Sequence, residues 1–473
     1  MQESAKGVEG GEQSQVAAPR SAFTMRALRR TLAANRVPML FGAFAAQNTL
    51  RLASNLVLTR LLSPDAFGAI GVILSINYVL QMLTDIGYHA FVVRSREADS
   101  RHFLNVVWTV RLLRSLALTL IMLIFAGVFA SAFNKPELEA PVRTMSILFL
   151  LEGLRSLNPN AAERARRISY ISAVELGVFS VQTAATITAA FVISSFWAMI
   201  IGIYAGALTQ AVTSYTLYPG GFHRIAFDRR IGADMWRFSR IVAVSSAITI
   251  ILNQADKIFI GRALSLDQFG LYMLASNLTG ATYQLIRSYS GRVLFPYFAE
   301  IARTTPDALD KLFYAARRKV TIPLSFLLGG GVGGGHLAVR ILFDDRYLPS
   351  GLYVSLLCVP LLFSLTTYPA EQLMVVKGRI RSTLEANIVR FSWIVVAAPL
   401  GVHYFGIIGL VSAFALMEAA PALFWWRRLA AAGVLSWREE AYPLAAAALG
   451  AGIGFGLDKL ADHLIATGAI PAF

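Results

Sequence analysis

A nine-residue phrase occurs twice in this chain and constrains its architecture more than any other feature. Residues 60–68 read RLLSPDAFG and residues 262–270 read RALSLDQFG, about 202 positions later. Each copy lies between two long apolar runs. Recurrence of a phrase in the same setting is typical of internal duplication, so we predict two homologous halves.

The composition places this duplication in a membrane. The mean hydropathy is +0.57, with 56% hydrophobic and only 15% charged residues. A soluble chain carries nearer a quarter of charged residues, so we predict a polytopic membrane protein. Internal repeats in such chains are typical of transporters, in which the substrate site lies between the repeats.

Apolar runs long enough to cross the hydrocarbon core form two sets of six. The first set is 38–60, 68–92, 109–132, 142–160, 168–192 and 195–217, and the second is 238–260, 270–295, 320–342, 350–376, 384–406 and 407–426. A thirteenth run, 442–457, carries Gly450, Gly452, Gly454 and Gly456 at a spacing that suits close helix packing.

These runs predict an all-α, polytopic membrane helical bundle with two six-helix lobes related by a parallel repeat. We expect lobes at 37–218 and 238–430, joined by a cytoplasmic linker at 219–237. A disordered, basic cytoplasmic tail at 1–36 precedes them, and a C-terminal extension at 431–473 adds one or two helices.

The basic residues indicate the orientation. With the N-terminus inside, the tail and the connections on its side carry about 29 of the 43 Lys and Arg residues. The net charge of +15 is therefore a topological signal and does not indicate nucleic-acid binding, which needs basic residues gathered on one folded face. Six spans per half is an even number, so both halves share one orientation.

No motif predicts catalysis, a cofactor or a metal site. Residues 329–336 read GGGVGGGH and satisfy GxGxxG only by letter, because no strand precedes them and no GK[ST] follows. The single cysteine, Cys358, lies in an apolar run, where a small core residue is expected. We therefore predict that the protein is not an enzyme.

Polar residues inside the spans are candidate substrate contacts, because ionisable groups in a membrane are costly unless they face protein or a water-filled cavity. Arg51 and Asn55 belong to a polar stripe in the first span. Asn253, Asp256 and Lys257 form the matching stripe in the seventh. We expect both stripes to line a common cleft.

Three further groups of residues are candidates for pyrophosphate binding, gating or proton coupling. Arg111 and Arg114 share a face of the third span, and arginine suits pyrophosphate recognition. Asp85 and Arg287 occupy equivalent positions of the two repeats and are gating candidates. Alternatively, each lies at the end of a helix, where its side chain reaches the lipid headgroups. The proton-coupling candidates, each of which can instead neutralise an arginine, are Glu175, Glu371 and Glu418.

At these residues the chain resembles the Wzx-like polysaccharide flippases of the multidrug/oligosaccharidyl-lipid/polysaccharide exporter (MOP) superfamily. The likeness covers most of 38–430. The motifs that carry it are TRLLSPDAFG at 59–68, DIGY at 85–88 with VVR at 92–94, DKIFIGR at 256–262 and GLY at 270–272.

The resemblance implies a bilobed bundle around a cationic cavity. Such a protein moves undecaprenyl-diphosphate-linked oligosaccharides across the bacterial inner membrane during lipopolysaccharide or exopolysaccharide synthesis. Its expected partners are that polyprenyl-diphosphate-linked glycan, membrane lipids and the polymerase or export machinery, with no cofactor.

Two alternatives stay open. An ion-coupled multidrug antiporter of the same superfamily would have a cavity lined by acidic and aromatic groups rather than by arginine. A membrane-embedded glycan polymerase or ligase would carry a sizeable external loop with catalytic polar residues, and the sequence has none between its apolar runs.

Overall fold

A computed structural model describes residues 37–165, 167–305 and 308–467, so the predicted tail lies outside the described residues. Every regular element in these ranges is helical. In chain order the α-helices are α2 (Val37–Leu61), α3 (Pro64–Leu83), α4 (Tyr88–Arg94), α5 (Arg101–Ile124), α6 (Ala126–Ala132), α7 (Glu139–Leu154), α8 (Asn158–Arg164), α9 (Ile168–Ile193), α10 (Phe196–Thr216), α11 (Arg229–Ala263), α12 (Leu266–Tyr289), α13 (Phe295–Thr304), α14 (Leu309–Gly333), α15 (Gly335–Leu342), α16 (Ser350–Val376), α17 (Arg381–Ala415), α18 (Ala419–Ala431) and α19 (Trp437–Ala466).

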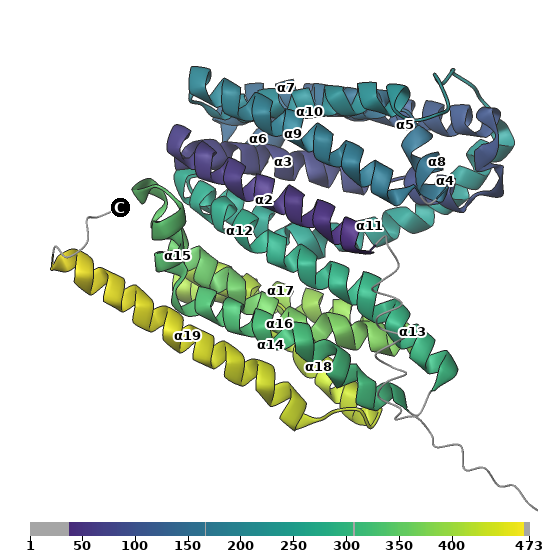
Figure 1. Cartoon of the computed structure of the whole chain (residues 1–473). Helices are drawn as coiled ribbons and strands as arrows, with labels where there is room; N and C mark the ends of the chain where they lie inside the picture. Colours follow the sequence, from purple (N-terminus) through teal and green to yellow (C-terminus); the bar gives the residue numbers. More distant parts are fainter. Residues whose placement is uncertain (1–36, 166, 306–307, 468–473) are drawn as a thin grey trace, which may run out of the picture.

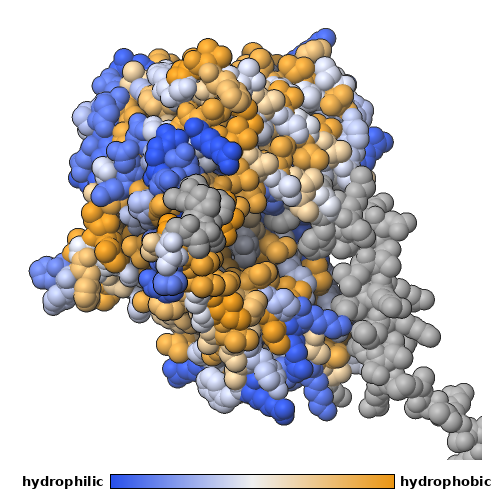
Figure 2. Space-filling model, turned by 60° about the vertical axis from the view of Figure 1, so that its left-hand side comes forward, coloured by the Kyte–Doolittle hydropathy of each residue, from blue (hydrophilic) through white to orange (hydrophobic). Residues whose placement is uncertain are grey.

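The protein is a multi-pass membrane protein. By length and apolar composition, seven stretches of helix in the described ranges can cross a membrane, or eight if α14 and α15, which are bent by 85°, form one span. This is fewer than the twelve to fourteen predicted. Helix α7 has only 16 residues, and one of the seven stretches, residues 381–431, holds two predicted spans. Figure 2 shows the apolar surface that covers much of one face.

The helices form two groups (Figure 1). Helices α5 to α7, α9 and α10 lie on one side, and α14 to α19 lie on the other, with α3, α11 and α12 between them. Because α17 adopts a non-helical conformation at Gly406, with φ of 59°, it folds back on itself there. Gly401 and Gly409 then touch through their backbones. The predicted spans 384–406 and 407–426 therefore lie on either side of this turn, and the second continues from α17 into α18.

Both copies of the repeated phrase lie at one end of the bundle, which we call the repeat end. Each copy begins a helix, α3 or α12, and these two helices cross in direct contact. A Cβ atom at Gly68 would lie 1.9 Å from the carbonyl oxygen of Leu266, and one at Gly270 would lie 1.7 Å from that of Pro64. Only glycine permits so close an approach of two backbones.

Each copy of the phrase is also bound by the opposite half of the chain. Tyr347 donates its hydroxyl to the carbonyl of Leu62 at 2.9 Å, and the Arg346 guanidinium donates to the carbonyl of Arg60 at 3.3 Å. In the other direction, Arg262 donates to the carbonyl of Ala132. These reciprocal hydrogen bonds close the repeat end.

The C-terminal extension provides one helix, α19, in the described range, and residues 468–473 lie outside it. This helix packs along α14, where Gly450 and Gly454 meet the backbone of that helix as the spacing predicts, while Gly452 and Gly456 face open space. Arg317 and Glu440 form an ion pair between the two helices, with both side chains 2% exposed. The extension is therefore an integral part of the second group.

Candidate substrate cavity

A large cavity of about 1970 Å³ lies between the two groups of helices. Residues of α2, α3, α8, α9, α11, α12, α16, α17, the π-helical segment after α12 and the α17–α18 turn line it. Along α12 the lining residues recur at helical spacing: Tyr272, Met273, Ser276, Asn277, Thr279, Gly280, Tyr283, Gln284, Arg287 and Ser288. At a rise of 1.5 Å per residue, this stripe spans roughly 24 Å, which is most of the hydrocarbon thickness.

The cavity is closed at one end and open at the other. Its inner end is reached at Gly71 and Tyr272, just below the contact between α3 and α12 that closes the repeat end. At the opposite end, which we call the linker end, the lining includes Ile380, 66% exposed, and Leu384, 55% exposed. The cavity therefore opens at the linker end.

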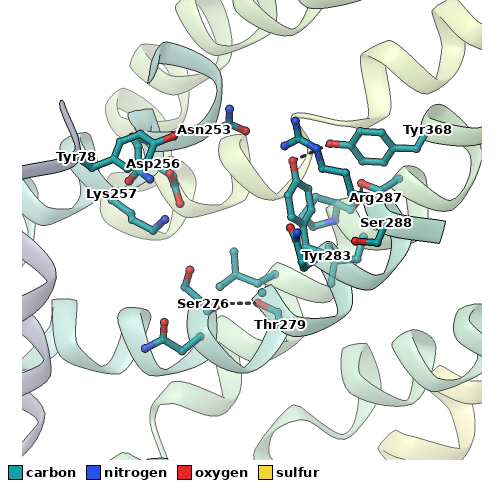
Figure 3. Close-up of a pocket in the computed structure, with 18 of the residues that line it drawn as sticks. Tyr78, Asn253, Asp256, Lys257, Ser276, Thr279, Tyr283, Arg287, Ser288 and Tyr368 are labelled. Carbon is teal, nitrogen blue, oxygen red and sulfur yellow. Dashed lines mark hydrogen bonds between the residues drawn. The ribbon is translucent and has the colours of Figure 1, made fainter. Parts of the chain in front are cut away.

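Figure 3 shows two groups of polar side chains facing this space. Tyr78, Asn253, Asp256 and Lys257 form one group. The second contains Tyr283, Arg287, Ser288 and Tyr368, and the hydroxyls of its two tyrosines lie 2.7 Å apart, which links α12 to α16. Ser276 and Thr279 lie between the groups along α12. An extended polar ligand would meet hydrogen-bonding groups along its whole length.

The charge of the lining differs from the cationic cavity that the family resemblance implies. Formal charges are equal in number, with five cations and five anions. The cations are Arg51, Lys257, Arg287, Arg292 and Arg390, and the anions are Glu163, Glu175, Asp256, Glu371 and Glu418. Positive charge is therefore available only where an arginine or lysine is not neutralised locally.

One arginine is neutralised by a predicted coupling residue. Arg390 binds Glu418 through two hydrogen bonds of 2.7 and 3.0 Å, and both side chains are buried. Thr367 also approaches the carboxylate, and Asn387 accepts a further bond from the guanidinium. This geometry is that of a structural ion pair, in which Glu418 neutralises an arginine.

Most of the predicted site residues line this cavity. Those from the first half are Arg51 and Glu175, and those from the second half are Asn253, Asp256, Lys257, Arg287, Glu371 and Glu418. Arg51 also lies over the ring of Phe179 on α9, 5.8 Å from its centroid. The Asp256 carboxylate accepts a hydrogen bond of 2.6 Å from Tyr272.

Arg111 and Arg114, in contrast, do not line the cavity. Arg111 is 4% exposed and donates to the carbonyls of Gly153 and Arg155, where α7 ends, while its guanidinium stacks on Tyr88. Carbonyls at a helix end lack partners within the helix, and the buried guanidinium satisfies them. Arg114 is similarly occupied, because it donates to a backbone carbonyl and a hydroxyl at the end of α3.

Two other predicted residues lie outside the lining. Asn55 is on the part of α2 nearer the repeat end, beyond the lining residues Gln47, Asn48 and Arg51. Asp85 follows α3, where its carboxylate accepts a hydrogen bond of 2.9 Å from the Gly87 amide. Only one member of the predicted gating pair, Arg287, therefore faces the cavity.

Several lining residues were not predicted from the sequence, although a signal for them exists. The polar residues of α12 recur every three to four positions, which is the pattern of a helix with one polar face. Arg292 follows this stripe within a π-helical segment, Ser290–Leu294. Together with Arg287 and Glu371, it lines a smaller adjoining cavity of about 340 Å³.

The fold is that of membrane transporters. The chain is similar to a structure described as lipid II flippase MurJ in an inward closed conformation, with a TM-score of 0.70 and 11% identity over 89% of this chain and 92% of that one. It is also similar to an inward-facing multidrug resistance MATE family transporter of the MOP superfamily, with a TM-score of 0.56 and 14% identity over 82% and 95%. These likenesses show that the chain shares its fold with the flippase and transporter structures of this kind.

The chain belongs to the polysaccharide biosynthesis protein family, whose model matches residues 57–350. This confirms the family resemblance. Similar proteins include the lipopolysaccharide biosynthesis protein WzxC of Escherichia coli, 23% identical over 76% of this chain and 73% of that protein. The teichuronic acid biosynthesis protein TuaB of Bacillus subtilis is 20% identical over 63% of this chain, and the match spans 62% of TuaB. The succinoglycan biosynthesis transport protein ExoT of Rhizobium meliloti is 25% identical over 62% of this chain and 58% of ExoT.

Proposed function

We propose that this protein translocates polyprenyl-diphosphate-linked oligosaccharides across the bacterial inner membrane by alternating access. The observation that carries the proposal is the cavity between the two helix groups, closed at the repeat end and open at the linker end. Its volume of about 1970 Å³ exceeds the 300–1,000 Å³ of ordinary small-molecule sites. A headgroup of several sugars fits this space better than a drug-sized molecule does.

In this proposal the headgroup enters from the linker end while the lipid tail stays in the bilayer. Among the lining cations of the described structure, Arg390 is paired with a lining carboxylate, Glu418. Arg51, Arg287 and Arg292 are the arginines that bind the pyrophosphate in this proposal, through charge-assisted hydrogen bonds. The amide and hydroxyl groups along α12 bind the sugars. Release follows when the repeat end opens and the linker end closes, so the cycle consists of binding and release without covalent chemistry.

The positive-inside pattern assigns the linker end to the cytoplasm and the repeat end to the periplasm. Substrate is then collected from the leaflet where it is synthesised. Glu175 and Glu371, which line the cavity without a bidentate arginine partner like that of Glu418, are the residues we propose to carry a coupling proton. The polymerase or export machinery would take the product on the periplasmic side.

One observation supports a second candidate, the ion-coupled multidrug antiporter. The five carboxylates and the tyrosines Tyr78, Tyr283 and Tyr368 are the lining expected for a cationic drug. Transport assays with purified protein in vesicles separate the two candidates, because a flippase moves a fluorescent lipid-linked oligosaccharide and an antiporter moves an organic cation.

The cavity assignment is tested by replacing Arg51 with alanine in a strain whose glycan export depends on this protein. Export should fall at normal protein level, because a pyrophosphate contact is lost. Arg143→Ala is the matched control, since Arg143 is exposed on α7 and pairs only with Glu139 in the described structure. Unchanged export with Arg51→Ala would refute the assignment. Polymer formation from substrate already on the periplasmic side would instead indicate a polymerase.

A further inference from the structure

The segment that joins the two halves is held in a fixed shape against the first half. Residues 217–228, which we call the strap, connect α10 to α11 and are drawn as the thin loop at the upper right of Figure 1. The sequence predicted a linker at 219–237, but helix α11 already begins at Arg229 because the Asp228 carboxylate accepts hydrogen bonds from the backbone amides of Arg230 and Ile231.

Buried hydrogen bonds fasten the strap. His223 is 9% exposed, and its Nε2 atom accepts a hydrogen bond of 3.1 Å from the Leu157 amide. Its Nδ1 atom lies 3.2 Å from the side-chain oxygen of Asn105. Three residues further on, the Ala226 amide donates to the hydroxyl of Thr109 at 3.0 Å. The strap is therefore a docked element rather than a loose tether.

The outward side of this docked element is apolar. Phe222, Ile225 and Phe227 are 79%, 68% and 74% exposed, and Trp236 in the second turn of α11 is 70% exposed. These four large side chains lie within fifteen residues and outside the predicted spans. Connections that face water normally carry polar residues. Exposed apolar side chains on a segment of fixed shape therefore indicate that this segment contacts another surface.

Charge indicates what that surface is. The same stretch, residues 222–240, carries five arginines and only two aspartates, Asp228 and Asp234. All five arginines are exposed: Arg224, Arg229, Arg230, Arg237 and Arg240. Arg230 pairs with Glu97 and Arg237 with Asp234, in ion pairs whose side chains stay solvent-accessible. The strap follows directly after α10, a membrane-spanning helix, so it begins at the level of the lipid headgroups. Aromatic residues together with arginines at this level are typical of contact with anionic lipids.

We propose that the strap and the first turns of α11 form a binding surface for anionic phospholipid headgroups. Phe222, Ile225, Phe227 and Trp236 insert between headgroups, and the arginines bind the phosphates. Because the strap also holds the start of α11, which runs on to the second half, this contact fixes the depth of the first half in the leaflet. A protein partner would need no such surplus of positive charge.

Trp236 provides a direct probe. The purified protein is reconstituted into phosphatidylcholine vesicles that contain phosphatidylglycerol, with bromine on the acyl chains of one lipid or the other at equal mole fraction. The signal of Trp236 is the fluorescence of the wild type minus that of Trp236→Phe. We expect brominated lipid to quench this signal, and brominated phosphatidylglycerol to quench it at least twofold more than brominated phosphatidylcholine.

Replacing Arg224, Arg229 and Arg237 together by glutamine should remove the preference for phosphatidylglycerol. Folding is checked by the melting temperature, which these exposed positions should leave unchanged. Arg143→Gln, at an exposed position of the first half near the repeat end, is the control that should keep the preference. No quenching of Trp236 would mean that the surface faces water or a protein, and equal quenching by the two lipids would refute the anionic contact. No glycan is present, so neither outcome depends on the cargo.

Discussion

The contact between α3 and α12 predicts a measurable shift in the conformational equilibrium. A methyl group at Gly270 would lie 1.7 Å from the Pro64 carbonyl oxygen, so the two backbones must separate by about 1.3 Å to reach even 3.0 Å. Overpacking of this kind costs about 1–3 kcal/mol. The cost arises only while the repeat end is closed, so Gly270→Ala should favour the state in which it is open by about 5- to 150-fold.

The control lies on the same helix. Gly280 lines the cavity and a methyl group there meets no atom within 4 Å. Alanine gains about 1 kcal/mol of helix propensity at either position, so the comparison of the two variants removes that contribution. Any remaining difference reflects the closed contact at the repeat end.

Access to the cavity from each side is the assay. Cys358, the one native cysteine, is replaced by alanine, and a reporter cysteine is placed at Ser276 on the cavity wall. Labelling by a membrane-impermeant maleimide from the repeat end should be about 5- to 150-fold faster in Gly270→Ala than in Gly280→Ala. Equal labelling rates in two folded variants would refute the claim that this contact closes the cavity, and Gly68→Ala should act in the same direction.

Two further predictions concern stability. Arg317→Met should lower the free energy of unfolding by about 3–5 kcal/mol, because it leaves the buried Glu440 carboxylate without its partner. Thermal unfolding in detergent measures this loss. The double variant Arg317→Met/Glu440→Leu should recover most of the lost stability, and a double variant as unstable as Arg317→Met would show that the ion pair contributes net stability. Burial, helped by Arg111 and Arg101, lowers the pKa of His223 from 6.5 to about 4. His223 binds a proton more readily when the strap is undocked, because its pKa is then near 6.5. The docked strap should therefore be fully stable above pH 6.5 and loosen as the pH falls towards 4. Proteolysis at Arg224 should increase over this range in the wild type and stay constant in His223→Gln.

The sequence predicted the helical class, the family and most residues of the two polar stripes, because these depend on local patterns that the chain displays directly. It could not place Arg111, since a buried arginine that binds carbonyls at a helix end and one that binds phosphate look alike in sequence. The polar face of α12 was readable from its spacing, but the gating hypothesis drew attention to Arg287 alone. The charge balance of the lining depends on which side chains meet across helices, and pairs such as Arg390 with Glu418 are 28 positions apart.

The repeated phrase that first indicated duplication also explains how the repeat end closes. Gly68 meets Leu266 and Gly270, while Gly270 meets Pro64 and Gly68. At the offset of about 202 residues, these are the same contact made in both directions, which is the pattern that a two-fold axis produces. Such an axis would pass between the two glycines, in keeping with the parallel repeat that the sequence predicts. The contact that closes the repeat end therefore joins equivalent surfaces of the two halves. A rocking motion of the halves would break the Gly68–Leu266 and Gly270–Pro64 contacts at the same time.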